Sequence, residues 1–148
     1  IETSIVKDVV PFSGGSTETA ISLIENRFEE LIDKTIKILR FSFGKKYHSA
    51  MLEFEEMLNE SDVTRIKLII TMIIIWLTDF QKYRLNEKDN LFFSNQIETL
   101  VKFNAKFPEI NISEVINNLD QISSSFRNNI NTNIAISNII FQLAKLTS

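Results

Sequence analysis

The sequence predicts an all-α protein, an irregular bundle of about five to six helices. Three Gly and two Pro among 148 residues leave little material for the tight turns of a β-sheet. Twelve Phe, with many Ile and Leu, recur instead at three- and four-residue spacing, the period of one helix face. Hydrophobic residues make up 44% of the chain and charged residues 24%, a balance that provides enough apolar surface for a core. We therefore expect one domain, or one domain with a fragment of another attached.

The first expected elements meet at a glycine turn. Residues 1–12 have the pattern of the last turn or two of a preceding helix, in a chain that we expect to be a piece of a longer protein. Gly14 and Gly15 end this segment, and the Ser16 hydroxyl can accept an unpaired N–H from the first turn of the next helix. Glu18 lies in that first turn, at the positive end of the helix dipole. The residues alone indicate a helix–turn–helix joint.

A long helix is expected over residues 17–43, which Asn26 can interrupt. Its apolar residues form one stripe, made of Ile21, Ile24, Phe28, Leu31, Ile32, Ile36, Leu39 and Phe43. Gly44 is expected to end this helix in the C′ position, after a last turn that holds Arg40. The next helix is expected over residues 47–58. Its inward side chains are Tyr47, Met51, Phe54, Met57 and Leu58.

The central helix is expected to begin at a cap formed by Ser61 or Asp62 and to reach Tyr83. It contains an apolar run over residues 66–77 that must be compared with a membrane span. The run is about a dozen residues long, against the roughly twenty that a span requires, and Lys67 lies within it. The pattern therefore favours a helix buried at the centre of the bundle, and we expect no membrane partner.

Two more helices are expected before the last one. A charged loop over residues 86–90 precedes a helix over residues 94–107, which Pro108 closes. Ser113 opens the fifth helix. The inward side chains of this helix are Val115, Ile116, Leu119, Ile122 and Phe126.

The end of the chain has a distinctive pattern. Residues 125–143 lead from an apolar helix, through an Asn-rich elbow that Asn131 can cap, into a strongly apolar terminal helix. The apolar residues of that helix are Ile134, Ile136, Ile139, Ile140, Leu143 and Leu146. This order of aromatic residue, basic residue, Asn-rich turn and aliphatic helix resembles the C-terminal end of bacterial DNA polymerase III clamp-loader subunits. In that family the last helix belongs to the collar that joins the subunits in a ring.

A second resemblance lies at the start of the chain. The segment Gly15-Ser16-x-x-x-Ala20-Ile21 is similar to the helix start in the lid of AAA+ clamp-loader subunits. ATP-binding members of that family carry an arginine two residues after the Ser, where it senses the nucleotide phosphates; Glu18 stands at that place here. Because a carboxylate repels a triphosphate, this copy should not sense nucleotide. The departure resembles the delta-prime subunit, whose relatives keep the fold and often lack ATPase function.

The two resemblances together imply a lid remnant over residues 1–25 and a C-terminal collar domain over residues 26–148. The implied function is non-catalytic oligomerisation in a delta-prime-like subunit, which supports loading of the sliding clamp in DNA replication. The implied partners are gamma/tau-type and delta-type subunits in the cytoplasm, with DNA and the sliding clamp reached indirectly through an ATP-driven complex. The interface residues expected on the last helix are Ile136, Ile139, Ile140 and Leu143.

The residues predict no catalytic group, no cofactor and no metal. A phosphate-binding loop needs a glycine five residues before Gly44 and Ser or Thr after Lys45, but Leu39 and Lys46 occupy those places. His48, the only histidine, has no carboxylate one helical turn away, so we expect it at the surface or its boundary. The absence of Cys excludes a thiolate metal site.

The charged residues indicate solvated faces. The acidic ones are Glu29, Glu30 and Asp33 on one face, and Glu53, Glu55, Glu56 and Glu60 on another. The local basic cluster consists of Arg40, Lys45, Lys46 and Tyr47, and a helix C-terminus explains it. A net charge of −3 provides no general attraction for nucleic acid.

Two other classes of function remain open. An unrelated all-α ligand-binding or adaptor module would be a stable monomer or homodimer, with a pocket lined by Phe and Met side chains. A gamma/tau-type subunit of the same loader is disfavoured by Glu18. Phe92 and Phe93 add to an apolar excess, which either a tightly packed terminal helix or a subunit interface would explain.

Overall fold

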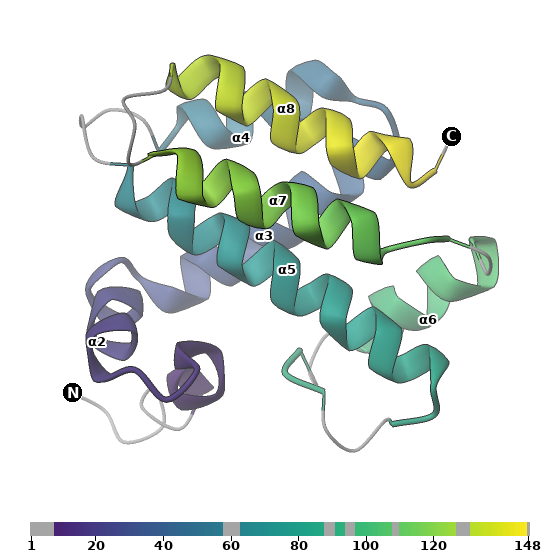
Figure 1. Cartoon of the computed structure of the whole chain (residues 1–148), viewed down its shortest axis with the longest axis horizontal. Coiled ribbons are helices and arrows are strands. Elements are labelled where there is room, and N and C mark those ends of the chain that lie inside the picture. Colours follow the sequence, from purple (N-terminus) through teal and green to yellow (C-terminus); the bar gives the residue numbers. More distant parts are fainter. Residues whose placement is uncertain are drawn as a thin grey trace.

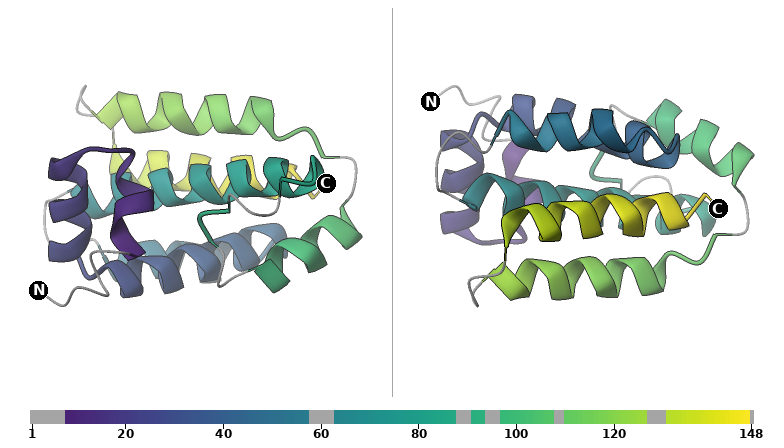
Figure 2. Two further views of the ribbon diagram at one scale, coloured as in Figure 1. Left: turned by 90° about the horizontal axis from the view of Figure 1, so that it is seen from below. Right: turned by 90° about the horizontal axis from the view of Figure 1, so that it is seen from above.

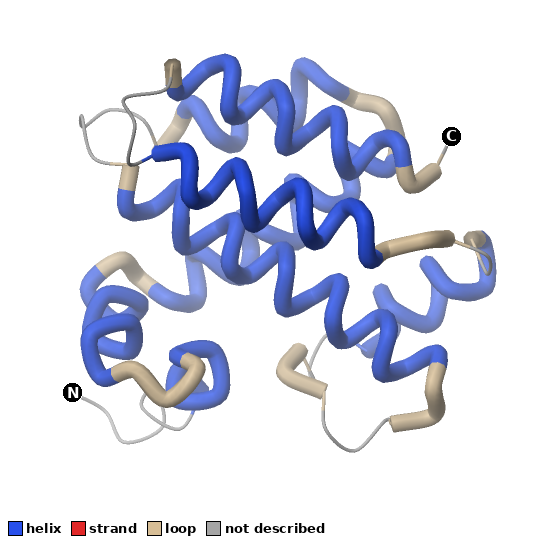
Figure 3. Tube along the Cα trace, viewed as in Figure 1, coloured by secondary structure: helices blue, strands red, loops and turns tan. Residues whose placement is uncertain are grey.

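The computed structural model describes residues 8–57, 63–87, 91–93, 97–107, 110–126 and 131–147. Within these ranges the chain forms seven α-helices and one short 3-10 helix, and no strand (Figures 1 and 3). In chain order they are η1 (Val10–Ser13), α2 (Thr17–Glu25), α3 (Phe28–Phe43), α4 (Tyr47–Glu55), α5 (Thr64–Arg84), α6 (Ile97–Lys106), α7 (Ser113–Ser125) and α8 (Thr132–Lys145). The all-α prediction is confirmed, with one more α-helix than expected because the long N-terminal helix is split in two.

Helix α5 forms the centre of the bundle. It contacts α3, α6 and α7, whereas α8 contacts α3, α4 and α7. Both views in Figure 2 show α7 on one side of the molecule, α3 and α4 on the other, and α5 and α8 between them. The N-terminal elements η1 and α2 lie at one end of this arrangement and α6 at the other (Figure 1).

The core is built on α5, as its apolar run predicts. The fully buried apolar side chains of α5 are Ile66, Ile69, Ile70, Met72, Ile73, Trp76, Leu77 and Phe80. A helix that is apolar on most of its circumference needs partners on several sides, and the three contacting helices provide them. In the described part of the chain, no helix has both the length and the apolar character needed to cross a membrane.

The break between α2 and α3 falls at Asn26 and Arg27. Arg27 has a φ of 58°, in the left-handed region, which stops the helix. The side-chain amide of Asn26 donates to the carbonyl of Ser22 at 2.7 Å and satisfies one of the last carbonyls of α2. Because the break reorients α2, the predicted stripe is interrupted: Ile21 is 49% exposed, so its inward placement was wrong.

Gly44 ends α3 as predicted, but it is not the left-handed residue. Its φ is −82°, and Lys45 after it has a φ of 58°. The N–H groups of Lys45 and Lys46 donate to the carbonyls of Ser42 at 3.1 Å and Phe41 at 2.8 Å, the Schellman pattern of helix ends. Glycine suits position 44 because a Cβ there would lie 3.2 Å from a carbonyl oxygen of α3.

The remaining helix ends lie close to the predicted ones. Helix α7 begins at Ser113 as expected, and α4 begins at Tyr47. Tyr47 is nevertheless 46% exposed, because Ala50 and Phe54 carry the buried face of α4, and Met57 is buried just beyond its end. The predicted boundary residues Leu58, Ser61, Asp62, Ser94 and Pro108 lie outside the described residues.

Candidate interaction surface

Helix α8 begins at the Asn-rich elbow. The side-chain oxygen of Asn131 accepts the N–H of Asn133 at 2.9 Å and the N–H of Ile134 at 3.3 Å. Two of the unpaired N–H groups in the first turn are thereby satisfied within the chain. The predicted cap is confirmed.

The inner face of α8 belongs to the core of the chain. Ile136, Ile139 and Leu143 are fully buried and Ile140 is 3% exposed. Helix α8 packs against α3, α4 and α7. These are the four residues predicted to contact another subunit, and packing within this chain already accounts for their apolar character. In this conformation the four side chains are covered by the chain's own helices, so their contact with another subunit stays a prediction, and the exposed residues of α8 are the ones that a partner can reach.

The outer face of α8, which we define as Ile134, Ser137, Asn138 and Phe141, is open. Ile134 is 65% exposed and Phe141 is 59% exposed. They are two helical turns apart, about 10 Å along the axis, with polar residues between them. Sequence reasoning missed Phe141 because it lies outside the buried stripe. The available signal was an aromatic residue one turn after the polar pair Ser137 and Asn138, on the side of the helix opposite the buried stripe. Ile134 was counted in the apolar period of this helix, but it lies on this exposed face.

Polar contacts hold α8 in place along its length. The side chain of Asn118 on α7 donates to Gln142 on α8 at 3.0 Å. The ammonium of Lys45 donates to the carbonyl of Ala144 at 2.8 Å, and the Thr147 hydroxyl donates to the carbonyl of Phe43 at 2.9 Å. Lys45 was assigned to the end of its own helix, but the structure shows it at the negative end of α8. The outer face is therefore presented by a fixed helix.

The lid-like segment at the start of the chain has the predicted local structure. The Ser16 hydroxyl accepts the N–H of Thr19 at 3.2 Å, and Glu18 lies exposed in the first turn of α2. Phe12 of η1 packs against Phe28 at 5.2 Å and Phe93 at 5.0 Å, measured between ring centroids. These contacts join the N-terminal segment to the same core as the later helices. A domain boundary after residue 25 stays a prediction.

One predicted acidic face is held by ion pairs. The carboxylate of Glu30 accepts a hydrogen bond from Arg65 at 3.3 Å, and Arg27 lies 3.5 Å away. The hydrogen bond to Arg65 holds the pKa of Glu30 below its usual value of 4.5. No group of three or more His, Asp or Glu side chains in the described ranges is arranged to hold a metal ion. His48 is exposed, in agreement with its predicted surface or boundary position.

The second acidic face pairs with a buried lysine. The ammonium of Lys34 on α3 donates to Glu53 at 2.8 Å and also to Glu56 beyond the end of α4. Burial lowers the pKa of Lys34, but the hydrogen bonds to the two carboxylates outweigh it and leave the pKa above 10.5. The lysine therefore ties α3 to α4 as a charged group. Glu60 lies outside the described residues.

Asp79 is a fully buried acid that sequence reasoning left unassigned. Its two carboxylate oxygens accept the N–H of Phe92 at 3.0 Å and the N–H of Phe93 at 2.7 Å. Burial raises the pKa of Asp79 above its usual 3.8, and the two N–H donors oppose that shift. Phe93 is only 3% exposed, so this part of the predicted apolar excess belongs to the core. Asp79 therefore has a structural role in fixing the segment after α5.

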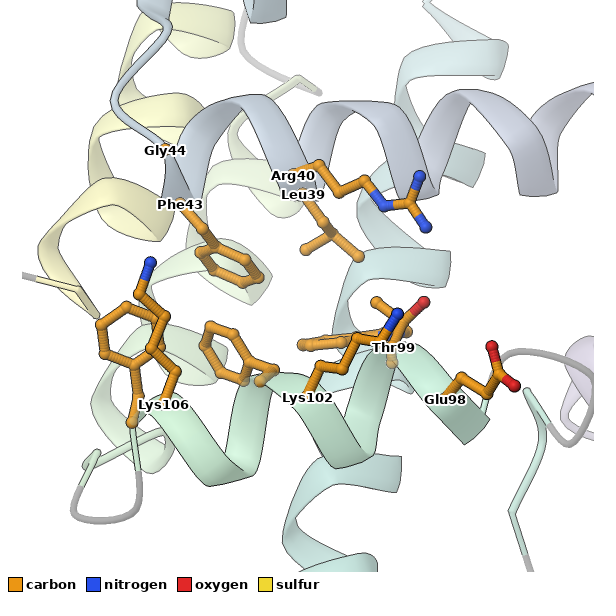
Figure 4. Close-up of a pocket in the computed structure, with 11 residues that line it drawn as sticks. Leu39, Arg40, Phe43, Gly44, Glu98, Thr99, Lys102 and Lys106 are labelled. Carbon is orange, nitrogen blue, oxygen red and sulfur yellow. The ribbon is translucent and has the colours of Figure 1, made fainter.

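A pocket of about 330 Å³ opens between α3, α5 and α6 (Figure 4). Its apolar lining includes Phe43, Trp76, Phe103 and Phe107. The alternative reading as a ligand-binding module predicted a pocket lined by Phe and Met; among the described residues that line this one there is no methionine.

Comparison with known families decides the assignment. A family model described as DNA polymerase III, delta subunit, C terminal matches residues 34–145. The chain belongs to this family. It is therefore a C-terminal domain of the DNA polymerase III delta-subunit family, a component of the clamp loader. No match was found among curated proteins or among solved structures.

The delta-family match covers most of the described fold. It begins at Lys34 within α3 and ends at Lys145, the last residue of α8, so it includes α4, α5, α6 and α7 entire. It leaves out η1 and α2, the segment that resembles a lid. The predicted membership of the clamp loader is confirmed, while a delta-prime identity is not distinguished by this match.

Proposed function

We propose that this domain is the non-catalytic collar of a delta-prime-like clamp-loader subunit, and that it holds neighbouring subunits together during sliding-clamp loading in DNA replication. The observation that carries the proposal is the family match from α3 to the end of α8. The expected partners are gamma/tau-type and delta-type subunits. Sliding clamp and DNA would be reached through the full complex, in the cytoplasm.

The outer face of α8 is our candidate for one of these contacts. Ile134 and Phe141 are exposed on a helix whose opposite side is fully buried, and a rigid aromatic anchor suits an interface. A specific interface buries on the order of 1,000 Å² or more, which is more than one strip of helix provides. The adjoining helices α4 and α7 would therefore contribute to the same contact.

The assignment to delta-prime rests on Glu18. By resemblance, this residue stands where ATP-binding subunits of the family carry their phosphate-sensing arginine. An exposed carboxylate at the start of α2 repels a nucleotide triphosphate, which supports a subunit that does not bind ATP. We also propose that residues 1–25 are the remnant of the lid and residues 26–148 the collar. The interruption of the helix between α2 and α3, at Arg27, supports a boundary there.

A pull-down with sibling subunits tests the collar function. The tagged domain would be incubated with the gamma/tau-type and delta-type subunits from the same cell, beside Ile134→Asp and Phe141→Asp variants. We expect capture by the wild type and a loss of about 10-fold or more in each variant, because a charge replaces an apolar anchor. Charges at Ile139 or Leu143 would disrupt the core, so those positions are unsuitable for this test.

The matched control is Leu85→Asp. Leu85 is 71% exposed and directly follows α5, whose C-terminal end lies away from α8 in Figure 1. Circular dichroism would establish that all variants are folded. The proposal is wrong if the folded wild type captures no sibling subunit. The use of the α8 outer face is wrong if Phe141→Asp and Leu85→Asp behave alike. Binding of ATP by the complete subunit would exclude the delta-prime assignment but would leave the collar function unaffected.

A further inference from the structure

The pocket between α3 and α6 combines a rigid aromatic floor with a cationic rim. Phe43 of α3 stacks on Phe103 of α6 with 4.4 Å between ring centroids, and Phe103 also contacts Trp76 at 5.4 Å and Phe107 at 5.2 Å. Trp76 is fully buried, whereas Phe43 and Phe107 are half-buried. The mutual packing fixes these rings, so the apolar lining is already formed.

The rim carries more positive than negative charge. Arg40, Lys102 and Lys106 are exposed cations that line the pocket, and Glu98 is the one carboxylate among the described lining residues. Figure 4 shows Lys102 and Lys106 extending from α6 towards α3, with the ring of Phe43 reaching into the space between the helices. Within the described ranges, none of the three cations forms an ion pair. Lys106 lies over the half-buried ring of Phe107, with its Nζ 5.4 Å from the ring centroid, and this contact leaves its N–H donors open to an acceptor. All three cations can therefore donate to a ligand.

We propose that this pocket binds an acidic peptide segment of a partner protein, with one aromatic side chain seated on the floor and flanking carboxylates paired with Arg40, Lys102 and Lys106. A volume of about 330 Å³ suits one large side chain with part of its backbone. Carboxylates are the natural partners of a rim that holds one guanidinium and two ammonium groups. The proposal does not depend on the outer face of α8.

A single-stranded nucleic acid also combines aromatic and anionic groups, but the structure favours the acidic peptide over it. Stacking of successive bases needs open ring faces along a basic groove. Here Trp76 is fully buried and Phe103 is 8% exposed, so only Phe43 and Phe107 keep ring surface open, enough for one aromatic side chain but not for a row of bases. The three cations surround one concavity, and the net charge of −3 provides no wider attraction for a polyanion.

The fluorescence of Trp76 provides a direct test, because it is the only tryptophan of the chain and lines the pocket. A short synthetic peptide with one Phe flanked by Asp and Glu would be titrated into the whole domain. Control peptides would replace the Phe by Ala or the acids by Lys, and a labelled oligo-dT strand would be the competing class. We expect saturable binding of the acidic aromatic peptide alone.

Charge variants then locate the site. Lys102→Gln and Lys106→Gln are expected to weaken peptide binding by about 3- to 10-fold each, the typical net contribution of one hydrogen bond, because both ammonium groups stay exposed to solvent. The matched control, Lys67→Gln, removes a cation nine residues before Trp76, about 14 Å along α5, and should leave binding unchanged. Equal weakening in the control, tighter binding of oligo-dT, or no change of Trp76 emission at millimolar peptide would each overturn the proposal.

Discussion

The two faces of α8 differ in what surrounds them. The inner face, Ile136, Ile139, Ile140 and Leu143, is closed against α3, α4 and α7. On the outer face, Phe141 leaves more than half of its surface in solvent although it is the largest apolar residue of the helix. The comparison teaches that apolar residues at helical spacing identify the face that packs in the core. A large apolar residue outside that stripe identifies a surface that is available to a partner.

The largest expected effect is on the inner face. Leu143→Ala should lower the free energy of unfolding by about 2–5 kcal/mol, because a fully buried side chain leaves a cavity among three helices. Urea denaturation followed by circular dichroism measures the loss. Phe141→Ala is the matched control on the outer face and should change stability by about 0.5 kcal/mol or less. Similar losses in the two variants would remove the distinction between the faces.

The next largest effect is expected at the ion pairs that join α3 to α4, two of the helices that pack against the inner face of α8. Lys34→Met should cost about 2 kcal/mol, because the ion pairs between α3 and α4 are lost and Glu53 is left without its cation. Since the pKa of Lys34 is raised in the folded state, its contribution is complete below pH 10.5 and is lost as the pH rises through the folded pKa. As the pH is raised through the alkaline range, the free energy of unfolding should therefore fall less in Lys34→Met than in the wild type, which urea denaturation at each pH measures. Parallel pH curves would contradict this assignment.

A smaller effect is expected at the start of α8, which positions both faces together. Asn131→Ala should lower stability by about 1 kcal/mol, because the first-turn N–H groups of Asn133 and Ile134 lose their acceptor. Asn133→Ala is a matched control, since only its backbone takes part in the cap. Thermal unfolding of both variants measures the difference. A cap without energetic importance would give the two variants the same melting temperature.

The smallest effect on stability is expected on the outer face. Phe141→Asp should change the free energy of unfolding by about 0.5 kcal/mol or less, because its side chain is already mostly in solvent. The same variant should nevertheless lose sibling-subunit binding. Urea denaturation of the variant beside the pull-down separates the two quantities. A loss of stability comparable with that of Leu143→Ala would mean that Phe141 belongs to the core.

The features that sequence reasoning predicted correctly depend on residues close together in the chain. The cap at Asn131, the cap at Ser16 and the buried run of α5 each follow from local hydrogen bonds or helical period. The break at Arg27 was foreseen at its neighbour Asn26. Its effect on Ile21 was not, because exposure depends on how two helices pack after the break.

The features that were missed depend on contacts between distant segments. The role of Asp79 requires the segment at Phe92 and Phe93 to fold back onto α5. Lys45 reaches α8 from the other end of the sequence. The pocket exists only where α3 and α6 come together. The four predicted interface residues of α8 lie in its strongest apolar period, and their burial within this chain likewise depends on how distant helices pack.

The most direct test of the collar account is photo-crosslinking in the reconstituted clamp loader. A photoreactive amino acid would replace Phe141 in one preparation and Leu85 in another, and the crosslinked partner would be identified by mass spectrometry. The account predicts that the group at position 141 captures a neighbouring clamp-loader subunit, whereas the group at position 85 captures it much less. Crosslinking to a sibling subunit from position 85 alone, or from neither position in an intact complex, would contradict it.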